Sequence, residues 1–146
     1  MIYIGSDHGG FKLKEELKNF LRARKIAFRD MGAKKYVEDD DYPQYAIAVA
    51  REVKKSPEKN KGILLCRSGQ GVCIAANKFK GVRAALAWNE RIARHSRNDD
   101  DANVLCLASD FISPETAQDV LSAWLDTPFS FEQRHIRRIK EIKKLE

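Results

Sequence analysis

This chain of 146 residues has few cysteines and no long apolar run, and both absences limit the classes of protein to which it can belong. Its three cysteines are an odd number without CxxC spacing, which argues against a disulfide framework and a zinc site and favours a reducing cytoplasm. No apolar run approaches the roughly 20 residues that span a bilayer. The start of the chain has no basic segment before an apolar stretch, so we expect no signal peptide. These absences predict a cytoplasmic protein with no membrane partner.

The charge is not of one sign along the chain, although the net charge is +6. Most basic residues are interleaved with Glu and Asp, which indicates a solvated surface, and we expect no nucleic-acid partner. The exception is the segment 131–146, in which six Lys and Arg residues outnumber three Glu. Arg134 and Arg138 are four residues apart and share a helix face, so both guanidinium groups could bind one phosphate. The alternative is an ordinary exposed helix face.

Short apolar strands alternate with helical segments along the whole chain, which predicts a single domain over residues 1–146 with a doubly wound α/β layer. The predicted strands are Ile2–Ile4, Ile26–Asp30, Ile63–Cys66, Val82–Leu86 and Val104–Leu107. The predicted helices are Phe11–Arg24, one opened by Pro43, Val72–Lys78, one carrying Ile92 and Ala93, one capped by Ser113 before Pro114, and a last basic helix after Pro128.

The run from Gly62 to Lys78 passes from a buried strand through a glycine turn into a helix. Such a junction presents free backbone amides to an anion and favours the thiolate form of a nearby cysteine, here Cys66. The alternative is a buried apolar cysteine that ends a strand. Gly69 and Gly71 lack the third glycine of a dinucleotide fingerprint and the lysine of a P-loop, so we expect no nucleotide site.

Two further polar stretches lie close to predicted strands. Asp7 and His8 follow the first strand and precede two glycines, which allow close backbone approach. They are either part of a ligand site or a helix cap beside a solvent-facing histidine. The run Asp99–Asp101 precedes the fifth strand and is most simply a solvated loop, since no supporting His or Cys ligands for a metal are evident. In such sheets ligands bind at the carboxyl ends of the strands.

Five motifs occur in the order of one known family: SDHGGF near the N-terminus, DYPQYA at 41–46, CRSGQGVCIAANKFKGVRAAL at 66–86, ANVLCL at the fifth strand and RHIRR at 134–138. With them the chain resembles the ribose-5-phosphate isomerase B family, which also contains galactose-6-phosphate isomerase subunits. The resemblance implies a Rossmann-like three-layer sandwich with a five-stranded parallel sheet and a C-terminal helix. It also implies a homodimer, often paired into tetramers, with active sites shared between subunits. The implied reaction is metal-independent interconversion of aldose and ketose phosphates, without a cofactor.

The resemblance implies roles for residues of the glycine turn. Cys66 matches the base that takes a proton from the carbon beside the carbonyl. Other members use a Glu six residues further on, where this chain has Val72. Ser68 and the amides of Gly69, Gln70 and Gly71 would hold the developing enediolate oxygen.

The remaining site residues also follow from the resemblance. His8, Arg134 and Arg138 match phosphate-binding positions, Asp7 matches a contact to sugar hydroxyls, and Tyr42 matches a tyrosine that lines the site. A dimer would let the basic residues of one subunit complete the site of the other.

Four further positions depart from the family pattern. Asp99 and Asp100 replace a His-Asn pair whose His opens the furanose ring, and we expect Asp99 to act as that acid with its pKa raised by its charged neighbour. Asp110 replaces an arginine and Arg67 a glycine. We hypothesise that Arg67 either takes over the substrate contact of the missing arginine or pairs with the Asp99–Asp101 run. The resemblance favours ribose 5-phosphate and ribulose 5-phosphate as the substrates. The alternatives to this function are an isomerase of a tetrose or hexose phosphate, or a sugar-phosphate-binding protein without catalysis.

Overall fold

The computed structural model describes residues 1–146 and places five strands in one sheet. All strand pairs are parallel, and the order across the sheet is β2-β1-β3-β5-β4. The strands are β1 (Ile2–Ser6), β2 (Phe28–Asp30), β3 (Lys61–Cys66), β4 (Ala84–Leu86) and β5 (Val104–Ala108). The predicted α/β class with a five-stranded parallel sheet is therefore confirmed.

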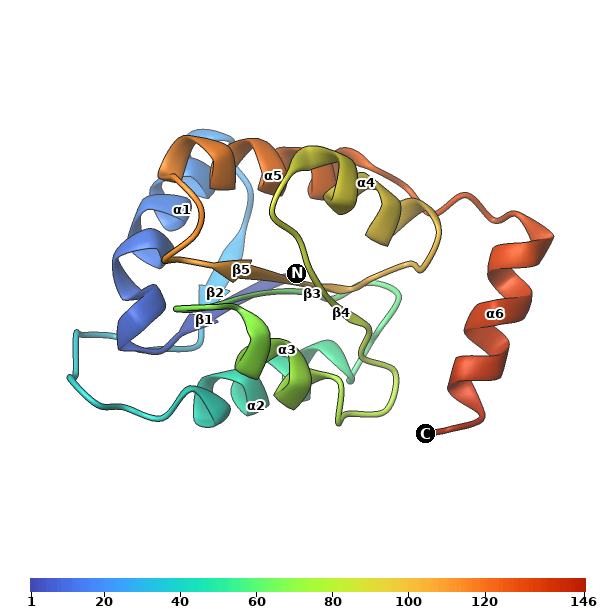
Figure 1. Cartoon of the computed structure of the whole chain (residues 1–146), viewed down its shortest axis with the longest axis horizontal. Coiled ribbons are helices and arrows are strands. Elements are labelled where there is room, and N and C mark those ends of the chain that lie inside the picture. The colour runs from blue at the N-terminus through green and yellow to red at the C-terminus, as the bar shows by residue number, and fades with distance from the viewer.

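Helices cover both faces of the sheet, which gives the three layers seen in Figure 1. One face carries α1, α4 and α5, and the other carries α2 and α3. The C-terminal helix α6 lies apart from both layers, beyond the end of the sheet at which β5 begins. No helix is long and apolar enough to cross a membrane. The helices are α1 (Phe11–Ala23), α2 (Tyr42–Val53), α3 (Gln70–Ala76), α4 (Glu90–Asn98), α5 (Pro114–Asp126) and α6 (Gln133–Lys143), with a 3₁₀ helix η1 (His8–Gly10) before α1.

The apolar run of β3 explains why this strand lies at the centre of the sheet. Ile63, Leu64 and Leu65 have no exposed surface. Ile63 and Leu65 pack in the core beneath α1 and α5, while Leu64 and Cys66 pack in the core beneath α2 and α3. A continuous apolar run is typical of a parallel strand covered on both faces, because both sets of alternating side chains are buried.

Several element boundaries differ from the sequence prediction by one or two residues. The second strand begins at Phe28, not at Ile26, because the amide of Ile26 donates to the carbonyl of Leu21 and stays in the turn that ends α1. The third helix begins two residues earlier and ends at Ala76, where the side chain of Asn77 exchanges hydrogen bonds with the backbone of Ala84 at the start of β4. The predicted Ser113 cap is confirmed, since its hydroxyl accepts from the amide of Thr116 at 3.1 Å.

Strand order reverses between β1 and β3, which places a ligand crevice at their carboxyl ends. Ser6 ends β1 and pairs with Leu65, and Cys66 ends β3 and pairs with Ala108 of β5. The loops that follow β1, β3 and β5 therefore meet at one edge of the sheet, which we call the carboxyl edge. The opposite edge, where β5 and β3 begin, is the amino edge.

Candidate active site

Cys66 is held at the carboxyl edge with a backbone donor on its sulfur. Its side chain is buried, and the amide of Gly69 donates to Sγ at 3.1 Å. Gly69 has φ of +70°, and a Cβ there would come within 2.5 Å of the Leu86 side chain and 3.0 Å of the Leu107 backbone. Only glycine fits this turn, and the turn aims the amide at the sulfur. An N–H donor stabilises negative charge on sulfur, so the arrangement suits a thiolate.

The amides predicted to bind an oxyanion are only partly free. The Gly69 amide is used on the Cys66 sulfur, and the Gln70 amide reaches the Ser68 hydroxyl at 3.4 Å. The Gly71 amide, in the first turn of α3, has no hydrogen-bond partner within the chain. A developing oxyanion would therefore meet the Gly71 amide and the exposed Ser68 hydroxyl first.

Val72, at the position where other family members carry a carboxylate base, lies in the core. It has no exposed surface and packs in the same core as Cys66. A valine there offers neither a proton acceptor nor a charge. The base at this edge of the sheet must come from another side chain, and Cys66 is the nucleophilic group at hand.

Tyr42 closes one side of the glycine turn. It is the first residue of α2, which packs against α3, and 40% of its surface is exposed. A Cβ on Gly71 would lie 2.5 Å from the Tyr42 ring, so the ring rests directly on the backbone at the start of α3. The predicted lining role of Tyr42 fits this position.

His8 is held by a carboxylate that sequence reasoning did not single out. Asp40 Oδ1 accepts from the His8 amide at 2.7 Å and lies 2.8 Å from His8 Nδ1, while Asp40 Oδ2 accepts from the Tyr45 hydroxyl at 2.7 Å. Asp40 belongs to the acidic loop before α2, whose charge run was the available signal. The partners fix the ring of His8 at the carboxyl edge.

The clamp on His8 favours its cation. The hydrogen bond to Asp40 raises the pKa of His8, with further support from the charges of Asp7 and Asp40, while burial and the Arg67 charge oppose it. Burial alone would raise the pKa of Asp40, but hydrogen bonds from Tyr45 and from the amide and ring of His8 outweigh burial and lower it. A positive imidazole at a strand end is suited to a phosphate.

Asp7 is buried beside His8 and acts as a cap as well as a candidate ligand. Its Oδ1 accepts from the Gly10 amide at 3.0 Å, so the predicted cap exists, on the 3₁₀ helix η1. Burial raises the pKa of Asp7, and the Gly10 hydrogen bond opposes that rise. The cap and the site are thus not alternatives, because one carboxylate oxygen caps η1 and the other remains for a sugar hydroxyl.

Arg67 forms an ion pair with Asp110, its NH1 lying 3.5 Å from Oδ2. The expectation that Arg67 pairs with the Asp99–Asp101 run is wrong, because that run lies at the other end of the sheet. Within it, Asp101 pairs with Arg83 at 2.7 Å and Arg97 at 2.8 Å. The two departures from the family pattern, Arg67 and Asp110, therefore contact each other at the carboxyl edge.

The remaining predicted site residues form a second group at the amino edge. Asp99 follows α4 and precedes β5, and it lies 3.9 Å from the ring of His135 on α6. Arg138 is one turn further along α6, and its charge opposes the burial that raises the pKa of the Asp100 carboxyl. Arg134 pairs with Glu132 at 2.8 Å. The five residues of β5, at roughly 3.3 Å each, separate this group from Cys66 by on the order of 15 Å. One chain therefore does not bring all the predicted site residues together at one edge of its sheet.

The pKa of Asp99 is shifted in the direction opposite to the expected one, and it is the pKa of Asp100 that is raised. Hydrogen bonds from Asn98 and His95 lower the pKa of Asp99, so its neighbour does not make it an acid. Burial and the charge of Asp99 raise the pKa of Asp100, against the charges of His135 and Arg138. Of the pair, Asp100 is the better proton donor. No group of three or more His, Cys, Asp or Glu side chains is arranged to hold a metal ion.

Comparison with known proteins identifies the family. Residues 2–142 match the family model described as Ribose/Galactose Isomerase. Ribose-5-phosphate isomerase B of Mycobacterium tuberculosis is 38% identical over 138 residues, covering 94% of this chain and 85% of that protein. A Mycoplasma genitalium ribose-5-phosphate isomerase B crystal structure with bound ribulose-5-phosphate has a TM-score of 0.95 and 42% identity, covering 99% of this chain and 94% of that one. The Clostridium thermocellum enzyme has a TM-score of 0.93 and 39% identity, covering 99% and 95%. The chain thus belongs to the Ribose/Galactose Isomerase family, as its motifs predicted.

Proposed function

We propose that this protein interconverts ribose 5-phosphate and ribulose 5-phosphate with Cys66 as the base. The observation that carries this proposal is the match over 99% of the chain to a ribose-5-phosphate isomerase B with ribulose-5-phosphate bound. The buried sulfur with its amide donor, and the raised pKa of His8 at the same end of the sheet, support it. Residues 1–146 act as one isomerase domain, and we propose a cytoplasmic location, where the thiol stays reduced.

The Cys66 thiolate removes the proton from C2 of the open-chain aldose, next to the C1 carbonyl. The electron pair moves through C1 and C2 to the carbonyl oxygen and gives an enediolate. Ser68 and the Gly71 amide stabilise the oxygen on which charge develops. A proton then moves from O2 to O1, and the Cys66 thiol returns its proton to C1. The product is the ketose, and the thiolate is regenerated.

A second copy of the chain completes the site. His8 and Asp7 of one copy bind the phosphate end and a hydroxyl, and Arg134 and Arg138 of the other copy bind the phosphate across the interface. The observation that supports this arrangement is the separation of the two residue groups at opposite edges of one sheet. The helix α6 lies clear of its own sheet, so its arginines are available to a neighbouring copy (Figure 1).

The acidic pair at the amino edge takes part in ring opening. In the assembled site it faces the sugar ring, as the family position of the pair implies. Asp100 donates the proton to the ring oxygen because its pKa is raised, and Asp99 orients the neighbouring His135. Asp99 was the expected donor, but the hydrogen bonds from Asn98 and His95 keep it ionised.

An assay over ribose 5-phosphate, a tetrose phosphate and a hexose phosphate tests the substrate. We expect the highest kcat/KM for ribose 5-phosphate. Faster turnover of the tetrose phosphate, which cannot close a furanose ring and needs no opening acid, would replace this proposal with the tetrose alternative. A chelator is expected to leave the rate unchanged, because the resemblance implies metal-independent isomerisation.

Solvent proton exchange separates an isomerase from a binding protein. With ribulose 5-phosphate in deuterated water, the proposed base exchanges the carbon-bound proton, and exchange is expected to disappear in Cys66→Ser. Cys73→Ser is the matched control, since Cys73 lies on α3 and its sulfur hydrogen-bonds the Ala84 carbonyl instead. Binding of the ketose without any exchange in the unmodified protein would favour the non-catalytic alternative.

A further inference from the structure

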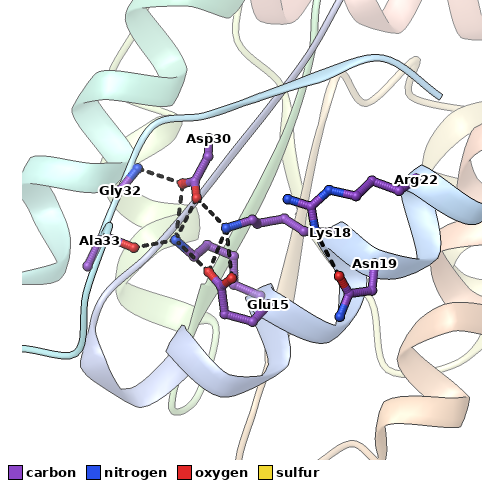
Figure 2. A network of polar contacts seen from close by, with 8 residues as sticks. Glu15, Lys18, Asn19, Arg22, Asp30, Gly32 and Ala33 are labelled. Atoms are coloured by element: carbon purple, nitrogen blue, oxygen red, sulfur yellow. Dashed lines mark hydrogen bonds and ion pairs between the residues drawn. The ribbon is translucent and has the colours of Figure 1, made fainter. Parts of the chain in front are cut away.

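Lys14 on α1 is a charged side chain with no exposed surface. Its ammonium group contacts Asp30, Ala33 and Glu15, which belong to the network of polar contacts in Figure 2. Nζ donates to Asp30 Oδ1 at 3.0 Å and to Oδ2 at 3.2 Å, lies 3.5 Å from Glu15 Oε1, and donates to the carbonyl of Ala33. The donors of the buried ammonium are therefore all directed at acceptors.

Stability alone does not explain a fully buried lysine at this position. Taking an ammonium out of water costs several kcal/mol, and an apolar residue of similar volume is often neutral or better for folding. The neighbouring Lys18 also pairs with Asp30, at 2.7 Å, so that carboxylate has a cation without Lys14. Lys14 makes two contacts that Lys18 does not: it donates to the Ala33 carbonyl, and its ammonium lies 5.3 Å from the centroid of the Phe11 ring.

Ala33 belongs to a short segment that continues along the end of β1. The Ser6 amide donates to the Gly32 carbonyl, and the Ala33 amide donates to the Ser6 carbonyl, both at 2.8 Å. Asp30 holds the same segment through the Gly32 amide at 2.9 Å. Lys14 therefore fixes the backbone that lies alongside Ser6, the last residue before Asp7 and His8.

From Ala33 the chain continues over His8. Tyr36 meets the His8 ring edge to face, with ring centroids 6.3 Å apart, and also meets Phe11 at 6.3 Å. Four residues later Asp40 binds the amide and ring of His8. The segment from Gly32 to Asp40 thus begins at the Lys14 network and ends at the clamp on His8.

We propose that Lys14 is a positioning residue for the phosphate site, because through Asp30 and Ala33 it fixes the start of the segment that carries Asp40 to His8. The proposal rests on the proposed function in one respect, that His8 binds the phosphate of the sugar. Lys14 itself touches no substrate. It acts through the placement of Asp40, and its loss frees the segment at its start.

Comparison of Lys14→Met with Lys18→Met, in the full chain, tests the proposal. Both variants remove one ammonium from Asp30, but only the first removes the contact with Ala33. The primary readout is the NMR titration of the His8 ring, assigned by its loss in His8→Asn. His8 is faced by Asp7, Asp40 and Arg67, none of which is changed. The second readout is KM and kcat with ribose 5-phosphate.

For Lys14→Met we expect the His8 midpoint to fall by about half a pH unit or more, since the Asp40 hydrogen bond is its main support. We also expect KM to rise roughly 5- to 10-fold with kcat within about 2-fold. Lys18→Met is expected to change neither. An unshifted His8 midpoint in Lys14→Met, or an equal shift in Lys18→Met, would overturn the proposal and leave Lys14 a structural residue.

Two further results keep the test decisive. If Lys14→Met does not fold, Asp30→Asn replaces it, because the amide oxygen still accepts from Gly32 while the anchor for the ammonium is weakened. Its His8 midpoint must then fall as well, and an unchanged midpoint contradicts the proposal. If the unmodified protein does not turn over ribose 5-phosphate, the proposed function fails, while the His8 titration still decides the role of Lys14.

Discussion

The carboxyl edge and the amino edge of the sheet carry two groups of candidate site residues with different surroundings. Cys66, Asp7 and the clamp on His8 are largely buried and tied by backbone and carboxylate hydrogen bonds. Arg134 and Arg138 stand on an outlying helix, and Arg134 is paired only with the exposed Glu132. In the proposed site, the first group holds the reacting atoms in place and the second offers charge to a neighbouring copy, so that neither group is complete alone.

Removing the thiol tests the carboxyl edge most severely. Cys66→Ser is expected to lower kcat by about 10³-fold or more, because a serine hydroxyl is a far weaker base and general-base catalysis is worth roughly 10²- to 10⁴-fold. Steady-state kinetics with ribose 5-phosphate measure the loss. Cys73→Ser, on α3 just after the glycine turn, should keep nearly full activity. Equal losses in both variants would mean that the turn is disturbed and that the base is not identified.

Removing one guanidinium tests the amino edge. Arg138→Ala is expected to lower kcat/KM by roughly 10- to 100-fold, as a charge-assisted hydrogen bond to phosphate is worth about 1.5–3 kcal/mol. The loss should appear mainly in KM and become smaller as ionic strength rises, because salt screens the attraction that the unmodified protein has for the phosphate. Arg137→Ala, on another face of α6, is the matched control. An unchanged KM in Arg138→Ala would remove the amino edge from the phosphate site.

The clamp on His8 makes substrate binding dependent on pH. Because the pKa of His8 is raised, its cation is present at low pH and is lost as the pH rises through the raised value. Asp40→Asn removes the main support, so the rise in KM should begin at lower pH than in the unmodified protein. The contribution of the raised His8 pKa to the folding stability has the same pH dependence, and it is lost on the alkaline side. If Asp40→Asn leaves the pH dependence of KM unchanged, His8 does not bind the phosphate.

The Arg67 and Asp110 pair should give the smallest effect. Both side chains are largely exposed, at 63% and 44%, and exposed ion pairs contribute about 0–1 kcal/mol. Arg67→Ala is expected to raise KM only about 3-fold through lost attraction for phosphate, with a thermal midpoint within a few degrees of the unmodified one. Asp110→Ala, which frees the guanidinium, should lower KM. If neither variant changes KM or stability, Arg67 has no part in the site.

Local sequence patterns predicted the sheet and the carboxyl-edge group well. The apolar run of β3 and the glycine turn after it are short-range features of the sequence. In the structure the run forms a strand that ends at Cys66, and Gly69 makes the turn that follows. The expected pairing of Arg67 with Asp99–Asp101 failed because residues just before a strand lie at the amino edge, a consequence of chain direction that spacing alone obscured. The clamp by Asp40 was missed because it joins residues 32 positions apart, and no local pattern distinguishes Asp40 from its acidic neighbours.

Mixing two impaired variants, assayed well below KM, tests most directly whether the two edges form one site across two copies. Cys66→Ser and Arg138→Ala are each purified, combined in equal amounts, dissociated and reassociated, and assayed with ribose 5-phosphate. Half of the dimers are then mixed, and each mixed dimer holds one site with intact Cys66 and intact Arg138, so activity should recover to about a quarter of the unmodified level. Activity that stays at the average of the two separate variants would contradict a shared site.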